Sequence, residues 1–123
     1  MGLSVSRKCS PRVFSEFQIH KLVVERLQEF AAPGIFWFHP FNRAASPRQG
    51  KMAKDMGVVA GVPDLIIFQE GLCWCLEIKA IGGKLSNAQK ATHEAINDAG
   101  IDVYTVSGYD EAIALLQAHG VLP

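Results

Sequence analysis

Residues 61–79 read GVPDLIIFQEGLCWCLEIK and predict two apolar strands joined by a tight turn at residues 69–71. Three charged residues interrupt these otherwise apolar strands: Asp64, Glu77 and Lys79. A charge in a buried strand costs several kcal/mol unless it is paired or binds a metal ion. Three such charges within one hairpin therefore predict a functional site.

The alternation of side chains along a strand brings these charges together. Glu77 and Lys79 point to the same face of their strand because they are two residues apart. If Phe68 pairs with Cys73 across the turn, Asp64 falls opposite Glu77, with about 5 Å between the two residues. Carboxylates this close repel each other unless a cation lies between them. Mg²⁺ fits such a site, and the alternative is a plain salt bridge of Lys79 with either carboxylate.

Further residues form an ordered set around this hairpin, spanning about residues 15–120. They are Glu16 in a first helix, His39 and Asn42 after a strand, Gly61-Val62-Pro63-Asp64, Glu77-Ile78-Lys79, and Leu85-Ser86 with Gln89. Pro63-Asp64 followed by Glu77-Ile78-Lys79 resembles the signature of the PD-(D/E)XK, or restriction-endonuclease-like, nucleases. The whole set is similar to the VRR-NUC family of that superfamily, in its stand-alone form from phages and bacteria.

This resemblance implies a function and a site. The fold would be α/β with an αβββαβ core, a mixed sheet flanked by helices, and the activity would be Mg²⁺-dependent endonucleolytic hydrolysis of DNA, with Mn²⁺ able to substitute. Stand-alone members resemble homodimers that cut branched DNA such as four-way junctions. The implied catalytic residues are Asp64, Glu77, Lys79, Glu16 and Gln89, and the implied metal ligands are Asp64, Glu77, the Ile78 carbonyl and Glu16.

Two of these residues also have a structural explanation. Ser15 and Gln18 predict a capping box at the start of a helix that runs to about Phe30, and Glu16 in its first turn is favoured by the helix dipole. Gln89 likewise stands three residues after Ser86, as the partner in a second capping box. Both roles stay open for each residue, and His20 either leans toward the site or is exposed.

The remaining elements follow from hydrophobic patterns. The first helix is predicted to bury a stripe of Ile19, Val23, Leu27 and Phe30, and residues 35–39 to form a strand without alternation that is covered on both faces. Residues 86–99 are predicted to form a helix with a buried stripe of Ala88, Ala91, Ala95, Ile96 and Ala99. Residues 101–106 are predicted to form a strand and residues 109–119 a last helix.

Residues 43–54 form a polar, basic connection that contains Pro47 and Gly50 and few core-forming side chains. One interpretation is a solvated loop. The other is a mobile segment that grips DNA phosphates, with His39 and Asn42 at its base near the active site. The DNA-binding candidates are therefore His39, Asn42, Arg43, Arg48, Lys51 and Lys54.

Composition bounds the class of protein. The chain has 123 residues, 49% of them hydrophobic, and no net charge, which fits one globular domain at 15–123 after a loose arm at 1–14. The charges are unevenly divided, because residues 1–54 carry nine Lys or Arg against three Glu, whereas residues 55–123 carry three Lys against nine Asp or Glu. No apolar run approaches the roughly 20 residues of a membrane helix. With no signal sequence and three cysteines, we expect a reduced, cytoplasmic setting, the host cytoplasm if the protein is phage-encoded.

Two other functions compete with a nuclease. A non-catalytic nucleic-acid-binding module on the same fold is the main alternative, although such modules typically lose the acids or the lysine. A sugar or nucleotide hydrolase that uses Asp64 and Glu77 as acid and base would need neither Lys79 nor a metal. The presence of all three charged residues favours the enzyme.

Overall fold

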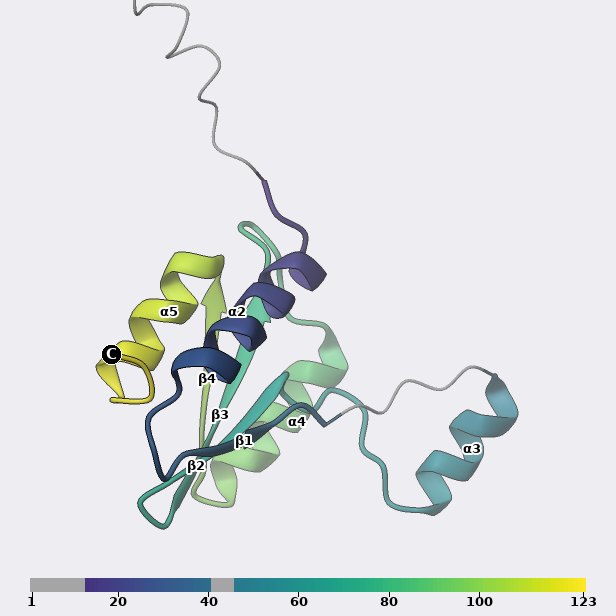
Figure 1. Cartoon of the computed structure of the whole chain (residues 1–123). Coiled ribbons are helices and arrows are strands. Elements are labelled where there is room, and N and C mark those ends of the chain that lie inside the picture. The colour runs from purple at the N-terminus through teal and green to yellow at the C-terminus, as the bar shows by residue number, and fades with distance from the viewer. Residues whose placement is uncertain (1–12, 41–45) are drawn as a thin grey trace, which may run out of the picture.

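A computed structural model of the chain describes residues 13–40 and 46–123 (Figure 1). In chain order its elements are α2 (Glu16–Phe30), β1 (Phe36–Phe38), α3 (Pro47–Asp55), β2 (Leu65–Gln69), β3 (Leu72–Lys79), α4 (Asn87–Asp98), β4 (Asp102–Ser107) and α5 (Tyr109–Ala118). This order contains the predicted αβββαβ core, with α3 inserted between β1 and β2. The predicted arm lies outside the description except for residues 13 and 14. Among the described helices, none is long and apolar enough to cross a membrane.

The four strands form one mixed sheet in the order β1-β2-β3-β4. The first three strands are antiparallel neighbours, and β4 runs parallel to β3. Phe68 pairs with Cys73 as predicted. The turn between them has positive φ at Glu70 (54°) and Gly71 (77°), the combination of a two-residue type I′ hairpin. The hairpin and its register are confirmed.

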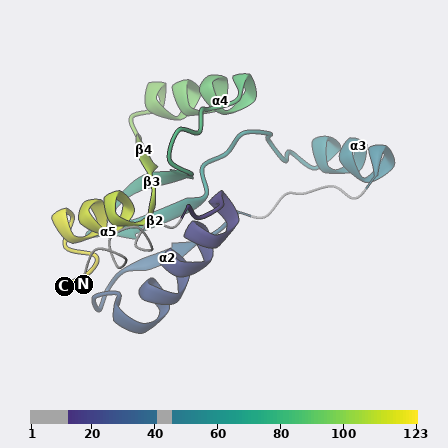
Figure 2. The ribbon, with the colours of Figure 1, turned by 90° about the horizontal axis from the view of Figure 1, so that it is seen from above.

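The helices cover the two faces of the sheet unequally. Figure 2 shows α4 on one side and α2 with α5 on the other. The second side holds the core, where Ile19, Val23 and Leu27 of α2 pack among buried residues of the strands and α5. The pattern predicts Phe30 in this stripe as well, but Phe30 is 47% exposed and lies under the Arg26 guanidinium.

β1 departs from its prediction because it is an edge strand. The missing alternation predicts that both faces of residues 35–39 are covered, yet Phe36 is 63% exposed and Phe38 is 40% exposed. Both rings pack with the ring of Phe68, with centroids 6.0–6.4 Å apart. These three residues form an exposed aromatic patch. On this face of the sheet α4 packs against β4, at the opposite edge, whereas the other face of β2 is buried in the core through Leu65 and Ile67.

The basic connection also departs from its prediction, because residues 47–55 form helix α3. The Ser46 side chain accepts a hydrogen bond from the Gln49 amide (3.2 Å) and so caps the helix. Pro47 stands in the first turn, where its missing N–H costs nothing. No residue of α3 is buried, and both views show α3 standing apart from the sheet (Figures 1 and 2). The loop interpretation is therefore wrong for this part of the segment.

Candidate active site

The two carboxylates of the hairpin meet at one end of the sheet. Leu65 pairs with Leu76, so the same register sets Asp64 opposite Glu77. Asp64 Oδ2 accepts a hydrogen bond of 2.7 Å from the Ile78 amide, which fixes the aspartate against β3. Glu16 from α2 joins them, because one carboxylate oxygen from each of the three residues lies within 4.8 Å of the others. The sequence-predicted acids are thus brought together.

Lys79 lies among these acids. Its Nζ is 3.6 Å from Glu16 Oε1 and 3.8 Å from Glu77 Oε2, and the residue is buried. The salt bridge considered from the sequence therefore exists. It does not exclude a catalytic role, since the same ammonium group faces the oxygens that a cation would share.

Gln89 serves the helix and the site at the same time. Its Oε1 accepts a hydrogen bond from the Ser86 amide (2.8 Å), which completes the predicted capping box of α4. Its Nε2 donates to Glu77 Oε2 (3.2 Å). Gln89 therefore has both roles that the sequence left open, since its amide oxygen caps the helix and its amide nitrogen binds Glu77.

His93 is a site neighbour that the sequence reasoning missed. It lies one turn after Gln89 on α4, is buried, and places Nε2 3.4 Å from Glu77 Oε1. The predicted alanine stripe of α4 is wrong, because Ala88, Ala91, Ala95 and Ala99 are exposed. The four-residue spacing from Gln89 was the available signal, since residues i and i+4 share a helix face.

Burial and the neighbouring groups together shift the pKa values of the two carboxylates in opposite directions. Burial, followed by the charge of Asp64, raises the pKa of Glu77 to about 8. Burial also raises the pKa of Asp64, but the neighbouring His20 and the Ile78 amide outweigh it and hold the pKa below its usual value. Burial lowers the pKa of His93, which disfavours the imidazolium that would otherwise be a cationic partner of Glu77.

The donor set fits a divalent cation. Glu77 is 1% exposed, and its Oε1 makes no hydrogen bond with any described residue. A buried carboxylate with an unsatisfied oxygen and a raised pKa is stabilised by a cation. Oxygen ligands from three carboxylates match the hard ions Mg²⁺ and Mn²⁺.

Comparison with known proteins finds the same fold in two solved structures. A solved structure described as "VRR_NUC domain protein" superposes with a TM-score of 0.66 at 25% sequence identity, covering 86% of this chain and 88% of that chain. This chain has the VRR-NUC fold. A second structure, "VRR_NUC domain", has a TM-score of 0.56 at 22% identity over 85% of this chain and 95% of that chain. No family model and no curated protein matches the sequence.

The VRR-NUC similarity supports the family and the restriction-endonuclease-like fold indicated by the sequence motifs. It also suggests a nuclease function and, with it, DNA binding. An open cavity of about 900 Å³ is lined by two of the three acids, Glu16 and Asp64, and gives a substrate access to them. Among the residues that line the cavity are Glu16, His20, His39, Asp64 and Gln89.

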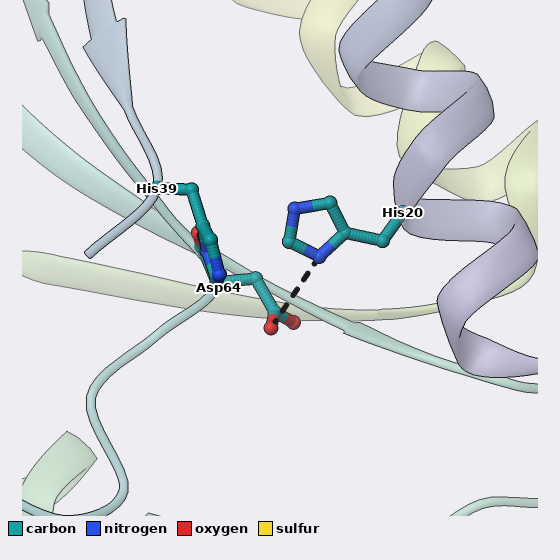
Figure 3. Close-up of side chains that lie close together, drawn as sticks. All are labelled: His20, His39 and Asp64. Carbon is teal, nitrogen blue, oxygen red and sulfur yellow. Dashed lines mark hydrogen bonds and ion pairs between the residues drawn. The ribbon is translucent and has the colours of Figure 1, made fainter. Parts of the chain in front are cut away.

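Two histidines stand on the cavity side of Asp64 (Figure 3). His20 on α2 places Nδ1 3.7 Å from Asp64 Oδ1. His39, after β1, places Nδ1 2.6 Å from the backbone carbonyl oxygen of Asp64. The two rings meet edge to face with centroids 4.6 Å apart. His39, predicted to contact DNA, therefore lies directly at the acidic site, and His20 leans toward the same site.

The other predicted DNA-binding residues divide between those that the structure describes and those that it does not. Asn42 and Arg43 lie outside the described residues. Arg48, Lys51 and Lys54 lie on α3, within about 120° of one another around the helix. We call these three residues the α3 cations. Asp55 neutralises part of this charge, because its Oδ2 lies 3.2 Å from Lys51 Nζ.

Proposed function

We propose that this protein is a Mg²⁺-dependent endonuclease that hydrolyses DNA phosphodiester bonds. One observation carries the proposal: carboxylate oxygens of Glu16, Asp64 and Glu77 converge within 4.8 Å, and the Lys79 ammonium lies beside two of these residues. A sugar or nucleotide hydrolase with a simple acid–base pair would not need this buried lysine. The VRR-NUC similarity supports the same interpretation.

The metal would be held by Asp64, Glu77 and Glu16, with the Ile78 carbonyl as a further ligand. Bound Mg²⁺ or Mn²⁺ neutralises charge on a scissile phosphate and lowers the pKa of a coordinated water. The Ile78 amide fixes the Asp64 carboxylate for this task through its 2.7 Å hydrogen bond. Gln89 fixes Glu77 from the other side through its 3.2 Å hydrogen bond.

Lys79 would act on the reacting phosphate. Its ammonium group donates hydrogen bonds either to the attacking water or to a non-bridging phosphate oxygen, whose negative charge grows as the new P–O bond forms. Its burial keeps water from screening this charge. The ion pairs with Glu16 and Glu77 place Nζ at the site before substrate arrives.

The proposed substrate is branched DNA such as a four-way junction. The α3 cations would contact phosphates, and two observations support this role: α3 stands apart from the sheet (Figure 1), and the helical spacing of the three cations groups them toward one side of the helix. Phosphate contacts position DNA without reading its sequence. Asn42 and Arg43, in the segment before α3, complete the proposed DNA-binding set together with His39.

We also propose a homodimer, in which two sites match the two-fold symmetry of a junction. The exposed aromatic patch supports this part, since three packed phenylalanine rings on β1 and the neighbouring β2 resemble a protein interface more than a solvated surface.

The test is cleavage of labelled duplex, flap, splayed-arm and four-way-junction DNA with Mg²⁺, Mn²⁺ or EDTA. We expect Asp64→Asn, Glu77→Gln and Lys79→Ala each to lose at least about a hundredfold in rate while remaining folded. Exposed matched controls are Asp98→Asn, Glu94→Gln and Lys84→Ala, which should cleave like the unmodified protein. DNA binding without cleavage under every metal condition would favour the non-catalytic module, and cleavage in EDTA would exclude the metal mechanism.

A further inference from the structure

We propose that His20, His39 and Asp64 form a second metal position, which binds a divalent transition-metal ion such as Mn²⁺ or Co²⁺ beside the three-carboxylate site. Each residue offers one ligand atom, and these atoms lie within 4.8 Å of one another. Figure 3 shows the three side chains gathered from α2, the end of β1 and the segment before β2. The position shares Asp64 with the proposed catalytic metal but does not depend on nuclease activity.

The separation of His20 from Asp64 suits ligands of one ion better than a direct hydrogen bond. His20 Nδ1 and Asp64 Oδ1 are 3.7 Å apart, beyond the roughly 2.7–3.2 Å of such a bond. Two ligands that each lie about 2.0–2.2 Å from a shared ion are about 3–3.5 Å apart. A small approach of His20 would therefore complete the pair.

The hydrogen bond of His39 prepares its ring as a ligand. The Asp64 backbone carbonyl can only accept, so the 2.6 Å contact requires that Nδ1 of His39 carry the hydrogen. That tautomer leaves the ring's lone pair on Nε2. Histidine ligands of metals characteristically donate their second N–H to a carbonyl or carboxylate in this way, which orients the ring.

The two oxygens of Asp64 face different neighbours. Oδ2 accepts from the Ile78 amide on the β3 side, whereas Oδ1 faces His20. Asp64 can thereby join a nitrogen-containing site to the oxygen-only site of Glu16 and Glu77. Imidazole favours transition metals over Mg²⁺, so the two positions should differ in metal preference. Both histidines line the open cavity, where an ion can enter.

The test is Co²⁺ titration of the untagged, DNA-free full chain, followed by proton NMR. Paramagnetic Co²⁺ shifts the ring protons of a ligating imidazole far outside the normal spectral range. We expect two shifted imidazole rings in the unmodified protein. His20→Gln and His39→Gln should each remove one set of signals and weaken Co²⁺ binding at least about tenfold. His119→Gln, which changes a histidine outside the cavity lining, should keep both sets.

The outcomes separate this proposal from the nuclease proposal. Glu77→Gln removes a ligand of the carboxylate site only, so it should lose cleavage and keep both shifted rings. If the unmodified protein cleaves DNA but shows no shifted imidazole signals with Co²⁺, the second metal position is wrong and the proposed function stands. Shifted signals without cleavage would support the metal position and count against the nuclease. Co²⁺ affinity equal to that of the unmodified protein in both histidine variants would also overturn the position.

Discussion

Replacing Gly61 by Ala should force α4 away from the hairpin that carries Asp64. A Cβ atom at position 61 would lie 2.5 Å from the Ala88 carbonyl carbon and 2.8 Å from the Gln89 amide nitrogen. Both are backbone atoms of the first turn of α4, so no side-chain rotation relieves the clash. Gly61 also has a φ of +83°, which disfavours any side chain.

The magnitude has two parts. The left-handed backbone costs an alanine about 1–2 kcal/mol, and overpacking a tight contact costs about 1–3 kcal/mol more. Gly61→Ala should therefore lower the free energy of unfolding by about 2–5 kcal/mol. Gly100→Ala is the matched control at the other end of α4, because Gly100 has a φ of +92° and a Cβ added there would meet nothing within 4 Å. Its free energy of unfolding should fall only by the cost of the left-handed backbone, about 1–2 kcal/mol.

Urea denaturation followed by far-UV circular dichroism measures both variants, with equal m values as the condition for comparing them. A movement of α4 would also separate Gln89 from Glu77, so cleavage should fall further in Gly61→Ala than in Gly100→Ala. If the two variants are destabilised equally, within about 0.5 kcal/mol, the close approach at Gly61 does not hold α4 in place.

Three further predictions concern charge and surface. The pKa of Glu77 is raised from 4.5 to about 8, so the fold favours its protonated form. The metal-free protein should therefore lose stability as pH rises between these two values, and Glu77→Gln should flatten this dependence in thermal melts. An unchanged slope in Glu77→Gln would contradict the raised pKa of Glu77. Changing the α3 cations to Ala should reduce the slope of log K for DNA against log [salt] by about 2–3 units, and an unaltered slope would place the DNA surface elsewhere. Phe38→Ser in the exposed aromatic patch should shift light scattering from about twice the 13.4 kDa chain mass to the chain mass, whereas an unmodified protein that is already monomeric would exclude the dimer.

The pairing of Asp64 with Glu77 could be predicted because it depends only on local rules. Alternation along a strand and a two-residue turn determine which residues face each other, and both are visible in residues 61–79. The capping boxes at Ser15 and Ser86 are equally local, which is why both helix starts are confirmed.

The errors arise where the answer depends on distant parts of the chain. The apolar run of β1 carries no sign that it lies at the edge of the sheet, since strand order is set by tertiary pairing. In α3, Pro47 and Gly50 suggest a break in regular structure, although Pro47 sits in the first turn, where proline is tolerated. His93 was missed because the alanines of α4 are exposed and His93 is buried in their place, an orientation that depends on how α4 packs against β4.

The double hydrogen bonding of Gln89 restricts what evolution or design can place at that position. A capping box accepts either glutamine or glutamate at its third residue, so helix propensity alone treats the two as interchangeable. Here the far end of the side chain lies 3.2 Å from Glu77 Oε2, and a glutamate would set a second anion against a carboxylate that is already buried. In a mutational scan, position 89 should therefore reject the substitution that ordinary helix statistics rate as conservative.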